Sequence, residues 1–234
     1  MVNNLYIGFD CAIKSLAVLF FLHNTQSNDN QILYIGLYKM INYKMPKMNN
    51  NFIVKISSIL KSILFLLDNI LNNIIIQKNI ENIYILIEHQ FKSSSSSRII
   101  ENMILYHYST NQPIDNISID NFYCNEINYK KKILNKKKSF PNIYTKIIGP
   151  SLKNKYEFYI KLRYSEFVEK YSTLKAANKN HTKENFKYYL KNKNKIKCLL
   201  KFKKNNIDDI ADSFMMIIGY ICNNKNLNPE IFLK

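Results

Sequence analysis

At 234 residues and 27.8 kDa, the chain is the size of one domain with insertions, or at most two small domains. Its formal net charge of +17 comes from 34 basic residues, of which only Arg98 and Arg163 are arginines. This balance favours a nucleic acid partner that is held by its phosphate backbone and shape more than by its base sequence. The four cysteines and four histidines form no zinc-binding spacing, and the four glycines form no glycine-rich phosphate loop.

The first 40 residues predict three strands. Residues 5–9 are apolar and end at Asp10, residues 16–22 are almost wholly apolar, and residues 32–40 follow a polar loop at 24–30. This pattern predicts a β-hairpin with a central first strand. Asp10 would then close a core strand, although it could also be an ordinary turn residue. The first strand follows Met1 closely and the cysteines have no paired spacing, so we expect no secretory signal and a reducing compartment.

A long amphipathic helix is predicted from residue 52, because apolar residues recur at a spacing of three or four up to residue 74. Lysine, aspartate and asparagine interrupt the apolar stretch 52–76, which argues against a membrane span. Residues 83–87 predict the next strand, and it ends in Glu88. A carboxylate therefore closes a buried strand for the second time.

The serine tract 93–97 predicts a flexible loop before a helix at 99–108. Flanked by Lys92 and Arg98, this loop could close over a phosphate backbone, or it could be a slack linker. Residues 111–142 lack a clear period and contain two lysine triplets, which predicts an inserted, mobile, basic segment. A fifth strand is expected at 144–148, and helices at 165–177 and 183–191, the second with Thr182 as its N-cap.

Three of only 17 acidic residues fall within five positions, at the start of an apolar run at 207–218. In a helix that begins near Asn206, Asp209 and Asp212 share a face, and Asp208 lies beside Asp212. Carboxylates next to a buried stripe repel each other unless a cation lies between them, and hard divalent cations prefer oxygen ligands. Alternatively, Asn206 is an N-cap and Asp208 and Asp209 favour the helix dipole, which leaves Asp212 unexplained.

A basic run precedes this helix, with lysines from 187 to 204 and no acid between Glu184 and Asp208. Charge of this kind usually forms a solvated face. Here it leads directly into the acidic cluster. Lysines that hold a phosphate backbone beside carboxylates that hold metal form a coherent nuclease pattern.

The order of these elements and acids resembles the ribonuclease H-like nucleases. Within them it is most similar to the poxvirus Holliday junction resolvases, relatives of bacterial RuvC and of fungal mitochondrial resolvases. The resemblance covers most of the chain except about 111–142 and 155–178. It rests on these segments: Asp10-Cys11-Ala12-Ile13-Lys14, Glu88-His89-Gln90, Ile148-Gly149-Pro150-Ser151-Leu152-Lys153, Thr182-Lys183-Glu184-Asn185-Phe186 and Asp208-Asp209-Ile210-Ala211-Asp212-Ser213-Phe214.

The resemblance implies a single RuvC-like α/β domain over 1–234: a five-stranded mixed sheet flanked by helices, with a basic insertion at 111–142. It implies that two Mg²⁺ or Mn²⁺ ions are bound by the four acids Asp10, Glu88, Asp209 and Asp212, with Asp208 as the reserve for Asp209. Lys14 and Gln90 would contact DNA. Ala12 stands where the family usually has glycine, and His89 where a longer basic or amide residue is common.

The implied reaction is phosphodiester hydrolysis that leaves a 5′-phosphate and a 3′-hydroxyl. The implied substrate is branched DNA, above all four-way junctions nicked symmetrically by a homodimer. The implied setting is viral recombination or concatemer resolution in the host cytoplasm. Two alternatives remain: another ribonuclease H-like nuclease that acts on RNA/DNA hybrids, and a basic DNA-binding protein without catalysis.

Overall fold

The structure is a computed structural model. It describes the following parts of the chain: 3–12, 14–27, 29–41, 50–90, 95–110, 141–149, 163–193, 207–225, 227–228 and 231–232. In chain order its elements are β1 (Asn3–Cys11), β2 (Ser15–Asn24), β3 (Asn30–Lys39), α1 (Asn50–Lys78), β4 (Ile80–Glu88), α2 (Ser95–Thr110), β5 (Asn142–Ile148), α5 (Tyr164–Lys170), α6 (Leu174–Asn192) and α7 (Ile207–Lys225).

The five strands form one mixed sheet in the order β3-β2-β1-β4-β5, with β1 at the centre. β1 and β2 are antiparallel, as are β2 and β3, while β4 lies parallel to both β1 and β5. This topology is that of the ribonuclease H-like fold, so the predicted fold class is confirmed. The five predicted strands are also confirmed, with ends that differ from the predicted ones by at most three residues.

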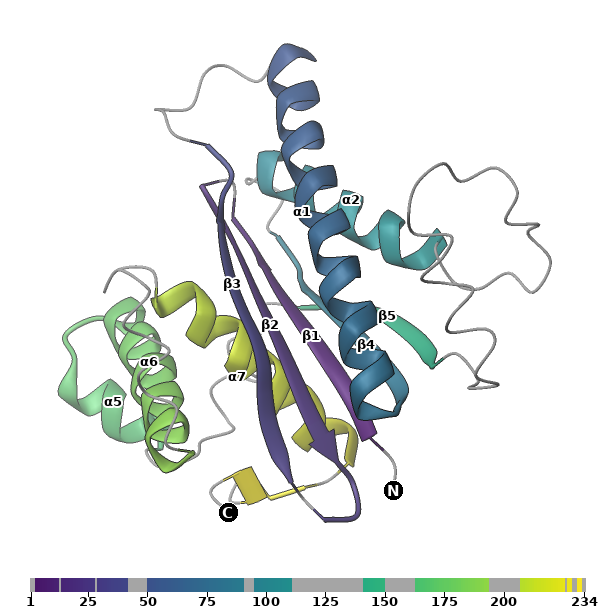
Figure 1. The fold of residues 1–234 in the computed structure, drawn as a ribbon. Coiled ribbons are helices and arrows are strands. Elements are labelled where there is room, and N and C mark those ends of the chain that lie inside the picture. Colours follow the sequence, from purple (N-terminus) through teal and green to yellow (C-terminus); the bar gives the residue numbers. More distant parts are fainter. Residues whose placement is uncertain are drawn as a thin grey trace.

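Helices cover both faces of the sheet, as Figure 1 shows, with α1 and α2 on one side and α7 and α6 on the other. Because side chains alternate along a strand, each strand contributes to both layers. In β1, Leu5, Ile7 and Phe9 lie in the core with α1 and α2. Tyr6 lies in the second core, with α6 and α7. Burial on both faces explains why β1 and β2 are nearly continuous apolar runs.

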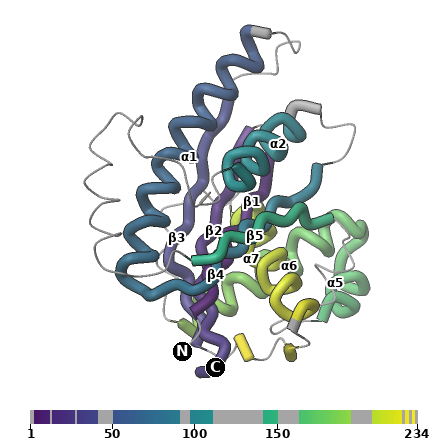
Figure 2. Tube along the Cα trace, turned by 90° about the vertical axis from the view of Figure 1, so that its right-hand side faces the viewer, coloured from purple at the N-terminus to yellow at the C-terminus, as the bar shows by residue number. Residues whose placement is uncertain are grey.

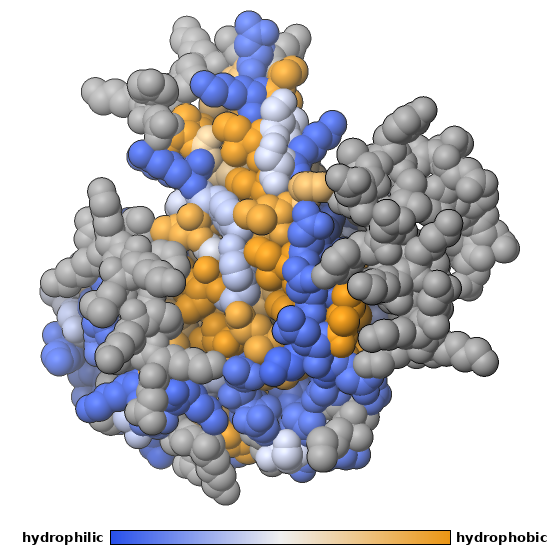
Figure 3. All heavy atoms as spheres, in the orientation of Figure 1, coloured by the Kyte–Doolittle hydropathy of each residue, from blue (hydrophilic) through white to orange (hydrophobic). Residues whose placement is uncertain are grey.

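α1 packs on the sheet through a stripe of apolar residues spaced three or four apart, as predicted. Its buried members include Phe52, Ile56, Leu60, Leu67 and Leu71. Other apolar side chains of α1 are exposed, namely Val54, Phe65 and Leu66, and Figure 3 shows apolar atoms along this helix. In the described part of the chain, the segment Asn51–Lys78 is the single helix with the length and hydropathy of a membrane span.

α7 crosses the sheet directly over β1, and the crossing point is Gly8. A Cβ atom on Gly8 would lie 3.0 Å from Ile217 Cδ1 and 3.1 Å from the Ser213 carbonyl oxygen. The missing side chain therefore lets the helix backbone approach the strand closely. Gly8 is two residues before Asp10, so this contact holds the N-terminal half of α7 near the carboxyl end of β1.

The predicted boundaries of the two helices between residues 163 and 193 were wrong, whereas α7 begins at Ile207, close to the predicted start. The chain breaks after α5, at 171–173, and α6 then begins with Thr173 as its N-cap, whose side-chain oxygen accepts from the Ala176 N–H at 3.2 Å. Thr182 is buried inside α6, and its hydroxyl donates to the carbonyls of Asn178 and Lys179. A threonine whose hydroxyl bonds to the preceding turn is compatible with a helix interior. The presence of a threonine at this position therefore did not indicate a helix start.

The serine tract is not wholly a loop, because α2 already begins at Ser95. Residues 93 and 94 lie outside the described residues, as does Lys92. Of the predicted insertion 111–142, Asn142 belongs to β5, Pro141 directly precedes that strand, and 111–140 lie outside the described residues. Asn206, the alternative N-cap of α7, also lies outside them.

Candidate active site at the carboxyl ends of the central strands

Asp10 and Glu88 lie at the same end of two neighbouring strands. β1 and β4 run parallel with Phe9 opposite Ile87, so the two acids follow a paired position. Gly8 contacts α7 and Leu86 lies in the core with α7. Since side chains two apart share a face, Asp10 and Glu88 are directed to the α7 layer as well. Two of the predicted site carboxylates are therefore brought to one edge and one face of the sheet.

The pKa of the buried Cys11 thiol is affected by the acids at this edge. Cys11 is fully buried on the opposite face, beside α2. Burial raises the pKa of this thiol well above its ordinary value, and the carboxylates of Asp10, Glu88 and Glu101 raise it further. Three acids thus act on one side chain, which is the electrostatic sign of a carboxylate-rich edge.

α7 adds its own carboxylates to this edge. The Ser15 hydroxyl, at the start of β2, donates a hydrogen bond of 2.7 Å to Asp209 Oδ2. Ser15 lies just beyond the turn that leaves β1, where Asp10 pairs with Ala17. The contact therefore places Asp209 beside the end of β1. Asp212 follows about one turn later on the same helix and is partly buried.

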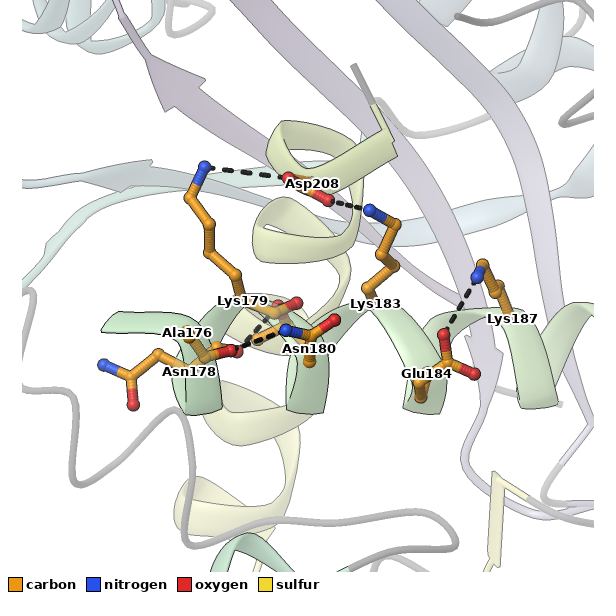
Figure 4. Close-up of polar contacts among 9 residues, drawn as sticks. Ala176, Asn178, Lys179, Asn180, Lys183, Glu184, Lys187 and Asp208 are labelled. Carbon is orange, nitrogen blue, oxygen red and sulfur yellow. Dashed lines mark hydrogen bonds and ion pairs between the residues drawn. The ribbon is translucent and has the colours of Figure 1, made fainter. Parts of the chain in front are cut away.

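Asp208 is turned to a different partner. Its carboxylate lies 2.8 Å from Lys183 Nζ and 3.6 Å from Lys179 Nζ, and Figure 4 shows it between these two lysines of α6. The side chains of Asp208 and Lys183 are only 15% and 16% exposed, so this pair is largely shielded from water. Asp209, the predicted ligand, and Asp208, its reserve, thus have different surroundings: Asp209 contacts the sheet edge and Asp208 contacts α6.

Glu101 is a buried carboxylate of this region that the sequence analysis missed. One oxygen accepts from the backbone N–H of Gln90 at 2.8 Å, and the other lies 2.9 Å from His89 Nδ1. Glu101 therefore fixes the chain just after Glu88. Its position one residue after Ile100, in the apolar repeat Ile100, Ile104 and Tyr108, was the available signal, because an acid beside such a stripe tends to be buried and paired.

The two predicted DNA contacts lie at the same edge. Lys14 is exposed in the turn between β1 and β2, and its carbonyl accepts from the Met40 N–H at 3.1 Å. Gln90 is partly buried, and its side-chain amide donates to the Glu88 carbonyl oxygen at 3.4 Å. Their contact with DNA stays a prediction.

The residue types at this edge fit a hard divalent cation, since carboxylate oxygens are the ligands that Mg²⁺ and Mn²⁺ prefer. Within the described residues, no three histidine, cysteine or acidic side chains lie close enough together to hold one ion. The ligand assignment of the four acids stays a prediction.

No protein-family model and no curated protein matches the chain. Among solved structures, it is similar to the Fowlpox virus resolvase in complex with Holliday junction DNA, with a TM-score of 0.45 and 14% identity over 94% of this chain and 99% of that one. The Fowlpox virus Holliday junction resolvase structure gives a TM-score of 0.42 and 12% identity, with the same coverage. Thermus thermophilus RuvC with a Holliday junction substrate gives 0.38 and 8%, over 94% of both chains. The sequence motifs resemble the same two groups of proteins, the poxvirus resolvases and RuvC.

Proposed function

We propose that the protein is a metal-dependent endonuclease that resolves four-way DNA junctions by paired, symmetric nicks. The observation that carries the proposal is the placement of Asp10, Glu88 and Asp209. They come from β1, β4 and α7, which are far apart in sequence, and they lie at one end of the sheet on one layer. Carboxylates brought to one edge offer the oxygen ligands that a hard divalent cation prefers.

Each residue has a distinct role in this proposal. Asp10, Glu88, Asp209 and Asp212 would hold two Mg²⁺ or Mn²⁺ ions, which supply an activated water and stabilise the leaving oxygen of the phosphodiester. Ser15 would hold Asp209 in place through its hydroxyl, and Glu101 would hold the segment that follows Glu88. Lys14 and Gln90 would contact the strand that is cut.

A row of lysines on α6 supports DNA as the partner. They recur at every fourth position, so successive members are about 6 Å apart along the helix axis. The row consists of Lys175, Lys179, Lys183, Lys187 and Lys191. Two of its members lie next to acids of the protein, since Lys183 pairs with Asp208 and Lys187 with Glu184 at 2.8 Å. We infer that a duplex arm lies along this lysine row.

Symmetric nicking requires two active sites related by a twofold axis, so we propose a homodimer with an isologous interface. The proposed setting is viral DNA recombination or concatemer resolution in the host cytoplasm. It rests on the resemblance to poxvirus resolvases, and a single nuclease domain spanning 1–234 is part of the same proposal.

The decisive experiment compares the two glutamates at opposite ends of β4. Glu88→Gln and Asp212→Asn should reduce metal-dependent cleavage of labelled four-way junctions by more than about 100-fold, because even groups that only orient a metal ligand cost about 10- to 100-fold. Glu81→Gln alters an exposed residue at the start of β4 and should leave cleavage unchanged. Linear duplex and RNA/DNA hybrid are tested in parallel, with Mg²⁺ and with Mn²⁺.

The other outcomes assign other functions. Cleavage confined to the hybrid would make the protein a ribonuclease H. Tight junction binding without cleavage under either metal would leave a basic DNA-binding protein without catalysis. Activity that survives in Glu88→Gln would refute the proposed site.

The lysine row has its own test. Replacing Lys179 and Lys187 by alanine should reduce the slope of log K against log salt for duplex binding by about 0.9 for each phosphate that the protein no longer neutralises. Replacing Lys55 and Lys61, two exposed lysines of α1 in the other layer, should leave that slope unchanged. Equal slope changes in the two double variants would show that binding follows net charge and not the α6 row.

A further inference from the structure

Three tyrosines form a stack that crosses the sheet from its centre to its edge. Tyr6, Tyr84 and Tyr144 are in register on β1, β4 and β5. Ring centroids are 4.8 Å apart between the first pair and 5.1 Å apart between the second, with interplanar angles of 11° and 19°. Tyr6 is 1% exposed and Tyr144 is 43% exposed, so the stack begins in the core and ends in solvent.

The outer face of the Tyr144 ring is where the next ring of the stack would lie. The ring spacing matches the distance of about 4.8 Å between neighbouring strands, so each strand contributes one ring. β5 is the last strand of the described sheet, and Figure 2 looks onto this side of the molecule. A flat aromatic group stacked on Tyr144 would therefore continue an existing stack.

A positive charge lies beside the exposed Tyr144 ring, which we call the aromatic platform. Lys146 follows Tyr144 on the same face of β5, and its Nζ lies 5.9 Å from the centroid of the Tyr220 ring. Tyr220 in turn lies edge-on to Tyr6, with the ring centroids 6.2 Å apart. An aromatic platform with a lysine next to it is the combination that binds single-stranded nucleic acid, where bases stack and cations hold the backbone.

The platform is also on the side of the sheet that carries the candidate active site. Tyr84 and Glu88 are four residues apart on β4, so both point to the α7 layer and lie about 13 Å apart along the strand. Lys146 lies between these two levels, opposite Leu86. A DNA strand that passes Glu88 could thus reach Lys146 and then Tyr144.

We infer that Tyr144 stacks with an unpaired nucleobase of the bound DNA and that Lys146 contacts its phosphate. The inference rests on the proposed function for the choice of DNA as the ligand. A strand of another protein chain is the weaker occupant of the β5 edge, because an exposed lysine on an edge strand opposes strand pairing. The net charge of +17 likewise favours a polyanion.

The test uses binding without metal, so it does not depend on cleavage. Junctions and gapped duplexes carry 2-aminopurine at successive unpaired positions. In the wild-type protein and in Tyr144→Phe, binding should quench the fluorescence of at least one position. In Tyr144→Ala the quenching should disappear, and affinity for gapped DNA should fall about 5- to 150-fold, as expected for the removal of one base stack of about 1–3 kcal/mol. Affinity for fully paired duplex should change little.

Tyr106→Ala is the matched control, because Tyr106 is 72% exposed on α2, in the other layer. It should leave quenching and affinity unchanged, and melting temperatures should confirm that both alanine variants are folded. Unchanged quenching in Tyr144→Ala, or an equal loss in Tyr106→Ala, would overturn the inference. A change in oligomeric state without any change in quenching would also overturn it and would assign the edge to a protein strand.

A failed stacking test and a failed nuclease proposal have different signatures. A protein that quenches 2-aminopurine through Tyr144 yet never cuts would keep the stacking site and lose the enzyme. A protein that cuts junctions but quenches 2-aminopurine equally well in Tyr144→Ala would keep the enzyme and lose the stacking site.

Discussion

The two layers that flank the sheet differ in chemistry, although every central strand contributes to both. On the α1 and α2 side, the sheet meets mainly apolar stripes, and the His107–Asp68 ion pair joins the two helices. On the α6 and α7 side, lysines and carboxylates accompany an aromatic core. Cys11 and Asp10 are neighbours in sequence, yet one is a buried thiol beside α2 and the other a candidate ligand beside α7.

This difference suggests that alternate residues of each strand have different roles, because they face different layers. Substitutions on the α1 and α2 side should change stability alone, whereas substitutions on the α6 and α7 side should change stability and DNA handling together. Glu101 is the informative exception, since it belongs to α2 but holds the segment after Glu88.

The largest expected effect is from Phe214→Ala. Phe214 is fully buried and contacts the rings of Phe186 and Tyr189, with centroids 5.1 and 4.9 Å away. Its loss should cost about 3–5 kcal/mol of unfolding free energy in denaturant titrations. Leu60→Ala, in the other core, should cost about 2–5 kcal/mol. At a temperature where both variants are folded, Leu60→Ala should bind junctions normally and Phe214→Ala weakly. Equal binding by the two variants would contradict the idea that only the α6 and α7 side affects DNA binding.

Gly8→Ala should have the next largest effect, about 1–3 kcal/mol, because a Cβ there meets the α7 backbone at the Ser213 carbonyl. The helix must move away from β1, which would also displace Asp209 and Asp212. We expect weaker Mn²⁺ binding by electron paramagnetic resonance as well as lower stability. Gly149→Ala is the control, since nothing lies within 4 Å of a Cβ at that position. A destabilised Gly8→Ala protein with normal Mn²⁺ affinity would show that the contact between Gly8 and α7 does not position the metal ligands.

Lys183→Ala should cost about 1–2 kcal/mol, because it leaves the largely shielded Asp208 carboxylate without its nearer partner. Lys179→Ala should cost less than about 0.5 kcal/mol, since that side chain is 54% exposed and 3.6 Å away. Unfolding of the single variants, of Asp208→Asn and of the double variants gives the coupling energies. Asp208→Asn should retain most junction cleavage, in contrast to Asp212→Asn. Equal loss of cleavage in the two would assign Asp208 to the site.

The smallest effect concerns alkaline pH. Burial raises the pKa of the Cys222 thiol from 9.0 to about 12. Above pH 9 the unfolded chain releases this proton while the folded chain keeps it, so stability falls as pH rises from 9 towards 12. The loss of unfolding free energy due to this thiol should reach about 1 kcal/mol by pH 10. Cys222→Ala should flatten the dependence of unfolding free energy on pH between 8 and 10. An unchanged slope would mean that the thiol ionises in the folded protein.

The strands and the two strand-end acids were predictable because they depend on local pattern: an apolar run followed by a carboxylate. The choice between Asp208 and Asp209 was not, because spacings of three and four to Asp212 both fit one helix face. Lysines of α6 and the hydroxyl of Ser15 separate them, and Ser15 is 194 residues from Asp209. Thr182 was misread for the same reason, since its hydroxyl bonds inside a helix that began eight residues earlier.

The distance in sequence between Ser15 and Asp209 also bears on when the proposed active site can form during synthesis. Strands β1 to β3 pair through short turns and can form early, while β4 must wait for the whole of α1 to be made. α7 is the last α-helix of the described residues, and without it two of the four proposed ligands are missing. A nascent chain that ends before residue 207 has only half of the proposed ligands, so the proposed nuclease activity should be the final property that the polypeptide acquires during synthesis.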